Sequence, residues 1–575
     1  MKVFTNYLKN HIWKSGIALT AKFLGALTDL WIPIILATII DEIAVQEDIP
    51  LTLKWGGYML LVAFASLVFN FTANFLASVI AGRVGQAVRR DLFGKIMYLS
   101  AAQVDEITLS SLETRLTSDT YNIQQVIAMM LRMGVRAPVL LVGGICMSFF
   151  LDPVLAIIIT LVMPIIIIFV MIIAKRGLTL YKNVQAGEDA MASCVRENVL
   201  GIRVIKALAA KDFETQKFRD INQNLTDSDI KATANMVLSN PFANGVLNIG
   251  SVLIVLVGGY RVAAGACDVG VLLAFATYFT IISAALMSIS RIFIMTTKGL
   301  ASGNRIQEVL DREEDLVIEK EEKRDDVPYI YFDHVNFSYH VRKNAKQEMN
   351  LKNITIGLEK GQTLGVLGAT GSGKSTLLLL LMRFYDVTDG NIYIDGENIK
   401  GIPLETLHKK FGVTLQSDYL FSDSILENIC FGRDLEMEDV EKSLHVAQAE
   451  KFVNSYDETY DYKLAIKGSN LSGGQKQRLL IARAVAGSPD ILILDDSSSA
   501  LDYKTDSLLR KELQKVQHKT TTVLVAQRIS SIKDADIIVI LDKGEIVDMG
   551  KHEELMDRCT LYQDLSAHQL GSMGE

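Results

Sequence analysis

The pattern of hydrophobic and polar positions divides the chain into two parts. Long apolar runs fill the first part up to about residue 300, and short apolar runs separated by helical patterns fill the rest. A helix needs roughly 20 apolar residues to cross the core of a bilayer. Six successive runs reach that length, which argues against buried helices of a soluble protein and predicts an all-α membrane domain with spans at about 17–40, 57–80, 126–151, 153–174, 237–260 and 269–295.

The connections between these spans alternate between short and long. The two long connections, 81–125 and 175–236, have helical periodicity and are rich in arginine and lysine. Basic connections favour the cytoplasm, and helical arms of about 20 residues would extend roughly 30 Å. The first fifteen residues are amphipathic and no small-residue cleavage site follows the next apolar run, so they predict an interfacial helix rather than a signal peptide. We therefore expect cytoplasmic helical stalks and a cytoplasmic N-terminus in a multi-pass protein of the cell membrane.

After residue 328 the pattern becomes that of an α/β domain. Short β-branched or apolar runs predict strands, and several have the character of fully buried strands of a largely parallel sheet: 363–367, 391–394, 491–494, 521–525 and 537–541. The charge-dense segment before them predicts a solvated linker. The expected domains are a membrane domain at 1–310, a linker at 311–327 and an α/β domain at 328–575.

Composition narrows the possible functions. Hydrophobic residues make up 49% of the 575 residues, and 66 acidic against 58 basic side chains give a net charge of −8. This balance excludes a broadly cationic nucleic-acid binder. The five cysteines are scattered without close pairs, which argues against a disulfide scaffold or a zinc site.

A glycine-rich loop provides the first candidate chemistry. Residues 368–375 read GATGSGKS between a predicted strand and a predicted helix. In that context the glycines let backbone N–H groups approach phosphates, the lysine adds a positive charge, and the serine hydroxyl is a Mg²⁺ ligand. The pattern predicts an ATP and Mg²⁺ site made by Gly368, Ala369, Thr370, Gly371, Ser372, Gly373, Lys374, Ser375 and Thr376.

Two further segments belong with this loop. The buried run ILIL ends in Asp495 and Asp496, of which the first should hold Mg²⁺ through water. Residues Leu471, Ser472, Gly473, Gly474 and Gln475 open another helix, with Ser472 as a natural N-cap;. A positive helix end is a second anion site, and one chain can hardly apply both sites to one phosphate. We therefore expect a head-to-tail pair of domains.

The order of these motifs resembles that of a half-transporter of the ATP-binding cassette (ABC) exporters, over essentially the full length. It includes Tyr339 in VNFSY, Gln416 in TLQSDY and the run Ser499–Asp502. The resemblance implies a six-helix transmembrane domain with long cytoplasmic helical extensions, followed by an α/β P-loop ATPase domain. It also implies that Tyr339 stacks on adenine and that Gln416 is a Mg²⁺ ligand and joins the metal to the membrane domain. Asp502 would link the two sites of a dimer, and stalk tips near 108–112 and 209–213 would touch the nucleotide domains.

The chain departs from the family pattern at the reaction centre. The usual general base, a glutamate, is replaced by Asp496, the usual switch histidine by Gln527, and a glutamate before the LSGGQ segment by Ile466. Displacing a catalytic group by about 1 Å costs on the order of a hundredfold in rate, and a neutral glutamine cannot exchange a proton as histidine does. We expect ATP binding with slow hydrolysis. The alternative is that Asp496 still works as the base and the glutamine is harmless.

The intact LSGGQ segment would serve the partner's nucleotide. This favours a non-identical partner that carries the glutamate and the histidine, as in the degenerate-site subunit of heterodimeric bacterial multidrug exporters, which the chain resembles. We expect ATP-driven export of a hydrophobic or amphipathic small molecule across the bacterial cytoplasmic membrane. A lipid or peptide flippase, and a nucleotide-gated channel or regulatory subunit, remain alternatives.

Ionisable residues inside the predicted spans are candidates for cargo contact, because charge in a membrane is costly and marks function. Lysine near a span end can instead reach the membrane surface, and arginines can pair with a carboxylate. The residues are Lys22, Asp29, Arg132, Arg136 and Arg291.

Overall fold

The computed structural model describes residues 2–319, 322–339, 349–416, 418–497, 501–517 and 520–571. Residues 320–321 of the predicted linker and Ser499 and Ala500 of the predicted SALD motif lie outside the described residues. The chain forms two compact units. The first comprises Met1–Met97 and Ser110–Arg312, and the second comprises Tyr98–Leu109 and Glu313–Glu575.

The first unit consists of long helices, and its six apolar helical segments confirm the prediction of six membrane spans. These segments contain α2 (Ile12–Thr38), α3 (Ile49–Met97), α7 (Arg136–Leu151), α8 (Pro153–Leu200), α11 (Ser239–Ala263) and α12 (Val269–Leu310). At 1.5 Å per residue, the 49 residues of α3 extend about 74 Å;. A bilayer core is only about 30 Å thick, so the helix continues well beyond a membrane.

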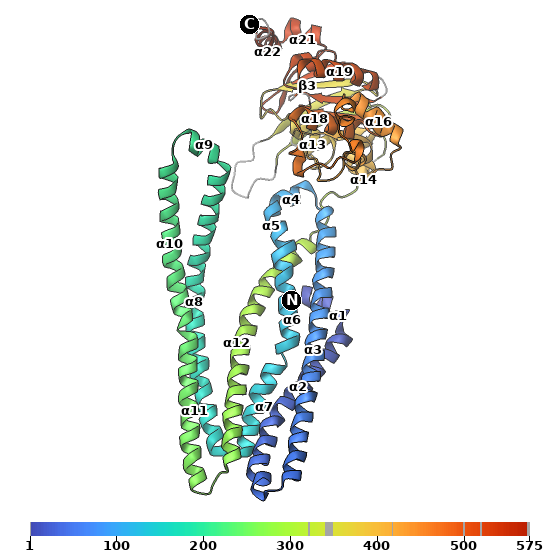
Figure 1. Cartoon of the computed structure of the whole chain (residues 1–575). Coiled ribbons are helices and arrows are strands. Elements are labelled where there is room, and N and C mark those ends of the chain that lie inside the picture. The colour runs from blue at the N-terminus through green and yellow to red at the C-terminus, as the bar shows by residue number, and fades with distance from the viewer. Residues whose placement is uncertain are drawn as a thin grey trace. The chain divides into compact units, whose positions relative to one another are not determined.

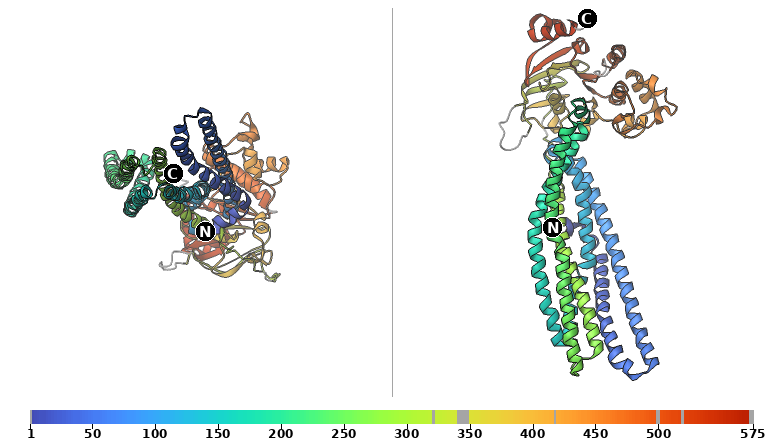
Figure 2. Two further views of the ribbon diagram at one scale, coloured as in Figure 1. Left: turned by 90° about the horizontal axis from the view of Figure 1, so that it is seen from below. Right: turned by 60° about the vertical axis from the view of Figure 1, so that its left-hand side comes forward.

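A helical hairpin forms the second long extension of this unit. The α8 helix packs along α10 (Lys211–Val237), and the short α9 (Ile202–Ala207) joins them, as Figures 1 and 2 show. The sequence placed the tip at 209–213, but α9 begins seven residues earlier. The turn residues Gly201 and Leu208 bound it.

The N-terminal part and the third span differ from continuous helices. The amphipathic α1 (Lys2–Lys9) is separate from α2. The predicted run 126–151 is divided between α6 (Thr120–Met133) and α7, with a break at Gly134 and Val135. Pro138 has no N–H to donate to a carbonyl four residues earlier, which accounts for a break at this place.

Two carboxylates, the buried Asp152 and the half-buried Asp41, fix two of the helix junctions. Asp152 alone separates α7 from α8; its Oδ1 accepts hydrogen bonds from the backbone N–H of Val154 at 2.8 Å, and its other oxygen pairs with Arg261 at 2.9 Å. At the end of α2, Asp41 accepts from the N–H groups of Gly270 and Val271 at the start of α12. A Cβ atom at residue 270 would lie 2.7 Å from the carbonyl oxygen of Ala37, so only glycine fits there.

The second unit contains two sheets. One is antiparallel, in the order β2 (Leu351–Leu358), β1 (Ile330–Phe337), β4 (Asp389–Ile394) and β5 (Glu397–Asn398). The other has the order β10 (Glu545–Gly550), β9 (Ile537–Asp542), β3 (Thr363–Gly368), β8 (Thr521–Val525), β7 (Ile491–Asp495) and β6 (Phe411–Thr414), and it is parallel except for β10.

All five predicted strands are confirmed, but one belongs to a different sheet. The run 391–394 lies in β4, which pairs antiparallel with β1, and not in the parallel sheet. A short apolar run does not reveal its pairing partner. In the parallel sheet β3 and β7 flank β8, so the carboxyl ends of β3 and β7 lie at the same edge.

Helices complete the second unit. Those that carry the motifs are α13 (Lys374–Leu381), α18 (Gly473–Val485) and α19 (Tyr503–Gln517). The others are α14 (Leu404–Lys409), α15 (Ile425–Cys430), α16 (Met437–Val446), α17 (Glu450–Val453), α20 (Ile529–Ile532), α21 (His552–Arg558) and α22 (Thr560–Gly571). The unit also contains α4 (Ala101–Ile107), from the first half of the chain.

A fully buried arginine holds part of the predicted linker against the second unit. Arg383 is 0% exposed and donates to the carbonyl oxygens of Val317 at 2.7 Å, Lys400 at 3.1 Å and Ile399 at 3.2 Å. It also pairs with Asp386 at 2.9 Å. The segment that the charge pattern suggested to be a solvated tether is therefore anchored at Val317.

Replacing this arginine should destabilise the second unit. Arg383→Met removes the donor of three carbonyl groups and the buried cation beside Asp386, which should cost about 3 kcal/mol. At about 2–4 °C per kcal/mol for a unit of this size, its thermal unfolding midpoint should fall by about 6–12 °C. Scanning fluorimetry of the purified chain tests this. The exposed Lys409, paired with Glu405 at 2.9 Å, provides a control, since Lys409→Met should shift the midpoint by about 1–2 °C at most.

Candidate functional site

The glycine-rich loop has the shape that phosphate binding requires. It connects β3 to α13, and Gly371 and Gly373 have positive φ angles of 81° and 105°. A Cβ atom at residue 373 would lie 2.6 Å from Cδ2 of Leu351, and one at Gly368 would lie 2.3 Å from the carbonyl oxygen of Leu541. Glycine is therefore required at the two ends of the loop, by close packing against neighbouring segments.

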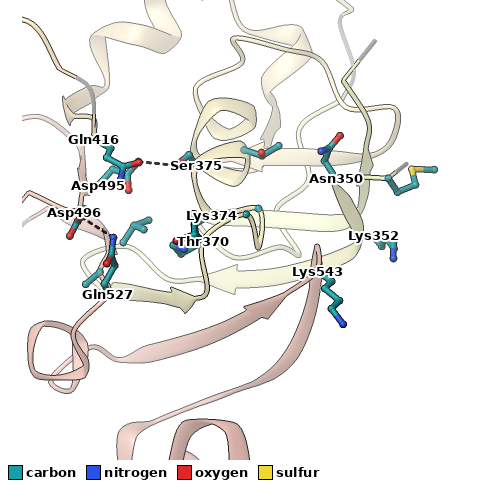
Figure 3. Close-up of a pocket in the computed structure, with 16 residues that line it drawn as sticks. Asn350, Lys352, Thr370, Lys374, Ser375, Gln416, Asp495, Asp496, Gln527 and Lys543 are labelled. Atoms are coloured by element: carbon teal, nitrogen blue, oxygen red, sulfur yellow. Dashed lines mark hydrogen bonds between the residues drawn. The ribbon is translucent and has the colours of Figure 1, made fainter. Parts of the chain in front are cut away.

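A cavity of about 830 Å³ opens beside this loop (Figure 3). The structure brings most of the predicted nucleotide and metal residues together around it: Thr370, Gly371, Gly373, Lys374, Ser375, Thr376, Gln416, Asp495, Asp496 and Gln527. Burial lowers the pKa of Lys374, whose ammonium group donates to the carbonyl oxygens of Gly368 and Ala369 at 2.8 Å each. The Oγ atom of Ser372 is buried without a hydrogen-bond partner in the described part of the chain. The unpartnered Ser372 hydroxyl and the Lys374 ammonium group are donors of the kind that bind a phosphate group.

A hydroxyl and a carboxylate meet at one wall of this cavity. The Ser375 Oγ donates to Oδ2 of Asp495 at 3.1 Å. Burial raises the pKa of Asp495, whereas hydrogen bonds from Ser375 and from the backbone of Gln416 act in the opposite direction. Oxygen donors of this kind suit Mg²⁺, which commonly takes one or two protein ligands and completes its shell with phosphate and water. The residues present fit that ion.

The second carboxylate of the pair has a different partner. Gln527 Nε2 donates to Oδ2 of Asp496 at 3.1 Å, as Figure 3 shows. The backbone N–H of Asp496 donates to the carbonyl oxygen of Val525 at 2.9 Å, and its φ angle is 48°. Burial raises the pKa of this carboxylate, while Arg528 and Lys374 act against the rise.

The LSGGQ segment lies apart from this cavity. Ser472 caps α18 in a capping box: its hydroxyl accepts from the N–H of Gln475 at 3.3 Å, and the Gln475 side chain accepts from the N–H of Ser472 at 2.9 Å. Ser472 and Gly473 are exposed. None of the residues 471–475, all of them described, lines the cavity.

Two residues implied by the family resemblance also lie outside the cavity lining. The Tyr339 hydroxyl donates to Oγ1 of Thr376, a lining residue, at 3.2 Å. Asp502 accepts from the N–H of Thr505 at 2.9 Å and from its hydroxyl at 2.7 Å, and these bonds lower the pKa of Asp502. It thereby stabilises the start of α19.

Three polar residues on the opposite wall were missed by sequence reasoning: Asn350, Lys352 and Lys543. Lys543 and Gly544 form the two-residue turn between β9 and β10, and both have positive φ angles. The Asp-Lys-Gly-Glu run signals that hairpin but not its proximity to the phosphate loop. Lys352 is a single lysine within β2 and pairs with Glu545 at 3.0 Å. No motif around it predicts that it borders the cavity.

The sequence did not single out the short helix α4, whose side chains bond to other segments of the second unit. Asp105 accepts from the Tyr385 hydroxyl at 2.6 Å, and Gln103 donates to the carbonyl oxygen of Glu313 at 2.7 Å. The sequence placed this tip near 108–112, directly after α4, and the second unit includes Tyr98–Leu109. Burial and the bond to Asp105 raise the pKa of Tyr385. The Tyr385 ring lies edge-on to Tyr339, with centroids 5.2 Å apart, so α4 connects to the vicinity of the cavity through two aromatic rings.

Comparisons with known proteins agree with this arrangement. Residues 15–286 match the family model of the ABC transporter transmembrane region, and residues 351–499 match that of the ABC transporter. The chain is 33% identical to the uncharacterized ABC transporter ATP-binding protein YfiB of Bacillus subtilis, over 100% of this chain and 99% of the relative. It is 31% identical to a putative multidrug export ATP-binding/permease protein of Staphylococcus aureus, over 90% of each.

A more distant relative and a solved structure extend the comparison. An ATP-dependent lipid A-core flippase of Aliivibrio fischeri is 27% identical over 97% of this chain and 95% of its own length. A solved bacterial Atm1-family ABC exporter with ATP bound superimposes with a TM-score of 0.80 at 22% identity, covering 98% of both chains. At that identity the match confirms the fold alone.

Two of the three lysines that line the cavity, Lys374 and Lys352, should contribute unequally to nucleotide binding. Lys374→Gln removes a half-buried ammonium group from the phosphate loop, and charge-assisted bonds of this kind contribute about 1.5–3 kcal/mol each. We expect affinity for a fluorescent ATP analogue to fall about a hundredfold. Lys352→Gln is the matched control, since its ammonium group already pairs with Glu545; a loss beyond about threefold there would contradict the assignment of the phosphate position.

Proposed function

Because this chain belongs to the ABC transporters, which are membrane ATPases coupled to transport, we propose that it is one half of a heterodimeric exporter whose own ATP site hydrolyses slowly. The nucleotide unit and the N-terminus lie in the cytoplasm, and the cargo is a hydrophobic or amphipathic small molecule moved outward across the bacterial cytoplasmic membrane. The basic long connections between spans support this orientation;. The named functions of two relatives, multidrug export and lipid A-core flipping, support this class of cargo.

The hydrogen bond from Gln527 to Asp496 carries the proposal of a slow site. A general base must offer a carboxylate oxygen to the attacking water and accept its proton. Here an amide N–H occupies Oδ2, and an amide cannot relay that proton. Aspartate is also one methylene shorter than glutamate, and a displacement of about 1 Å costs on the order of a hundredfold. Burial raises the pKa of Asp496 and strengthens it as a base, so the deficit lies in reach and orientation.

The groups that hold the nucleotide are separate from this deficit. Lys374 and the loop amides would bind the phosphates, and Ser375, Asp495 and Gln416 would hold Mg²⁺; their common place at the cavity supports this assignment. The ion supplies neutralisation of phosphate charge when it is bound. Tyr339 would stack on adenine, next to Thr376. The site therefore binds ATP firmly and turns it over slowly.

The position of the LSGGQ segment supports a two-chain arrangement. The capping box occupies Ser472 and Gln475, which leaves the amides of Gly473 and Gly474 at the positive end of α18 for an anion. Because the segment does not line its own chain's cavity, it serves the nucleotide of the partner, and Asp502 links the two sites. A partner with a glutamate and a histidine at the two altered positions then has the competent site.

Restoring the two altered residues should raise hydrolysis. We expect the purified chain alone to bind ATP yet hydrolyse far below the roughly 10 s⁻¹ typical of enzymes. Asp496→Glu alone should recover only part of the rate because the glutamine remains. Asp496→Glu with Gln527→His should increase kcat at least tenfold, with nucleotide affinity unchanged within about threefold.

Phosphate-release assays and binding isotherms measure these quantities on the same preparations. Rapid hydrolysis by a homodimer of the unaltered chain would contradict the proposal. Co-expression with a half-transporter that carries the glutamate and histidine should restore turnover, and vesicle uptake of cargo against a gradient distinguishes a pump from a channel. A lipid substrate in the same assay identifies a flippase, the alternative that the lipid A-core relative favours.

The affinity for Mg²⁺ should depend on pH through Asp495. Burial raises the pKa of this carboxyl above its usual value near 3.9;. The protonated carboxyl group cannot hold Mg²⁺. The affinity for Mg²⁺ is therefore highest well above the raised pKa and falls as the pH decreases through it. Mg²⁺ titrations of the nucleotide-loaded protein at about pH 7.5 and 5.5 measure the change. The Asp495→Asn variant is the control, because ionisation of the nucleotide affects it and the unaltered protein equally. An identical pH dependence in the variant would overturn the assignment of Asp495 as a Mg²⁺ ligand.

A further inference from the structure

A cluster of charged residues lies within the membrane-spanning helices, apart from the nucleotide site. On α2, Asp29 accepts from the Ser66 hydroxyl of α3 at 2.5 Å and from the guanidinium group of Arg136 on α7 at 2.9 Å. One α2 residue, Lys22, is only 3% exposed. It donates to the side-chain oxygens of Asn70 at 2.9 Å and of Asn74 at 3.0 Å, which are neutral partners.

The cluster has an excess of positive charge. The charged groups that act on Lys22 are Arg136, Asp29 and Arg132, so among the described residues three cations share one carboxylate. Arg132 donates to the hydroxyl of Ser78 at 2.5 Å, again a neutral partner. Charges within a bilayer are stable only when they are paired, hydrated or neutralised by a bound group. Two cations of this cluster have no counter-charge in the described part of the chain.

A cavity of about 400 Å³ adjoins this cluster. Asp29 and Arg136 border it from α2 and α7, Thr280 and Ser288 border it from α12, and Met133 and Leu140 are among its apolar lining. Its volume falls within the range of small-molecule sites. The Arg136 side chain is 42% exposed and uses one terminal nitrogen on Asp29. The other terminal nitrogen, Nη1, has no hydrogen-bond partner among the described residues, so the partly exposed guanidinium group has unused donors at the cavity.

We propose that this cavity binds an amphiphile that carries one anionic group, a carboxylate, sulfate or phosphate, next to Arg136. The guanidinium fork suits planar or tetrahedral oxyanions, and the apolar part of the ligand lies along Met133 and Leu140. A cationic ligand is disfavoured, because both oxygens of Asp29 already accept hydrogen bonds and the surrounding charge is positive. The inference rests on the proposed export function and specifies its cargo class.

Binding of matched probes tests the inference. The full-length protein is placed in phosphatidylcholine nanodiscs without ATP and titrated with dansylaminoundecanoic acid, its methyl ester and a trimethylammonium analogue of equal chain length. The acid should bind at least about tenfold more tightly than the other two, the effect of one charge-assisted contact. Equal affinity of the three probes would overturn the inference.

Two variants with opposite expected effects separate a charge site from general damage to the fold. Arg136→Gln should weaken binding of the acid about tenfold and leave the ester unchanged. Asp29→Asn should strengthen binding of the acid, because Arg136 loses its internal counter-charge. Asp29→Asn with Arg136→Gln avoids an unpaired buried carboxylate, and its acid affinity should fall to that of the ester. Arg291→Gln is the control, since Arg291 is an α12 arginine that does not line the cavity. Insensitivity of the acid to both single changes would overturn the inference.

A further experiment determines whether the anionic group belongs to a membrane lipid or to a soluble amphiphile. Nanodiscs with about one third phosphatidylglycerol should displace the acid if the natural ligand is a lipid headgroup, whereas undiminished binding of the acid identifies a soluble amphiphile. Because no ATP is hydrolysed, the result is independent of the slow site and of the partner chain. If the acid does not bind as expected, the proposal of one slow and one competent ATP site is unaffected. If that proposal is wrong, the result on the membrane cavity is unaffected.

Discussion

A carboxylate removed from water is costly unless a cation or several hydrogen bonds compensate it, and this constraint determines how the first unit is joined. Asp41 accepts two backbone N–H groups at the start of α12, and Asp152 caps α8 and pairs with Arg261. Asp119, only 1% exposed, accepts from the Ser302 hydroxyl at 2.8 Å and pairs with Arg305. Each carboxylate connects helices that are distant in sequence, so the helical arms are held by polar contacts as well as by apolar packing.

The same constraint distinguishes the two neighbouring aspartates of the nucleotide site. Asp495 receives a hydroxyl hydrogen bond and keeps oxygen atoms for a metal, whereas Asp496 receives an amide from Gln527. Burial raises the pKa of both. The two differ in their partners and also in exposure, because Asp495 is buried and Asp496 is half-buried. Binding and hydrolysis can therefore be lost independently. In the proposed heterodimer, this chain would keep its nucleotide bound while the partner's site performs the turnover.

Each unit has one further polar feature that bears on its site. Within the second unit, the rings of Tyr339 and Tyr385 lie edge to face and Tyr385 donates to Asp105 of α4. A change at Thr376 on the cavity wall thus has a short physical route through the two rings to α4, within the same unit. In the first unit, the excess positive charge around Asp29 is the feature that the helical packing leaves uncompensated, and it gives the membrane cavity a chemical preference that apolar lining alone would not.

The sequence by itself determined the six spans, the phosphate loop, the aspartate pair and the departures at residues 496 and 527, because each depends on local spacing or on a single residue type. Only the tertiary structure decided that β4 joins an antiparallel sheet, that Asp105 of α4 bonds to Tyr385, and that Lys352 and Lys543 border the cavity. It also paired Asp29 with Arg136 across 107 residues of chain. Such pairings depend on which segments pack together, and no periodicity or motif within one segment encodes its distant partner.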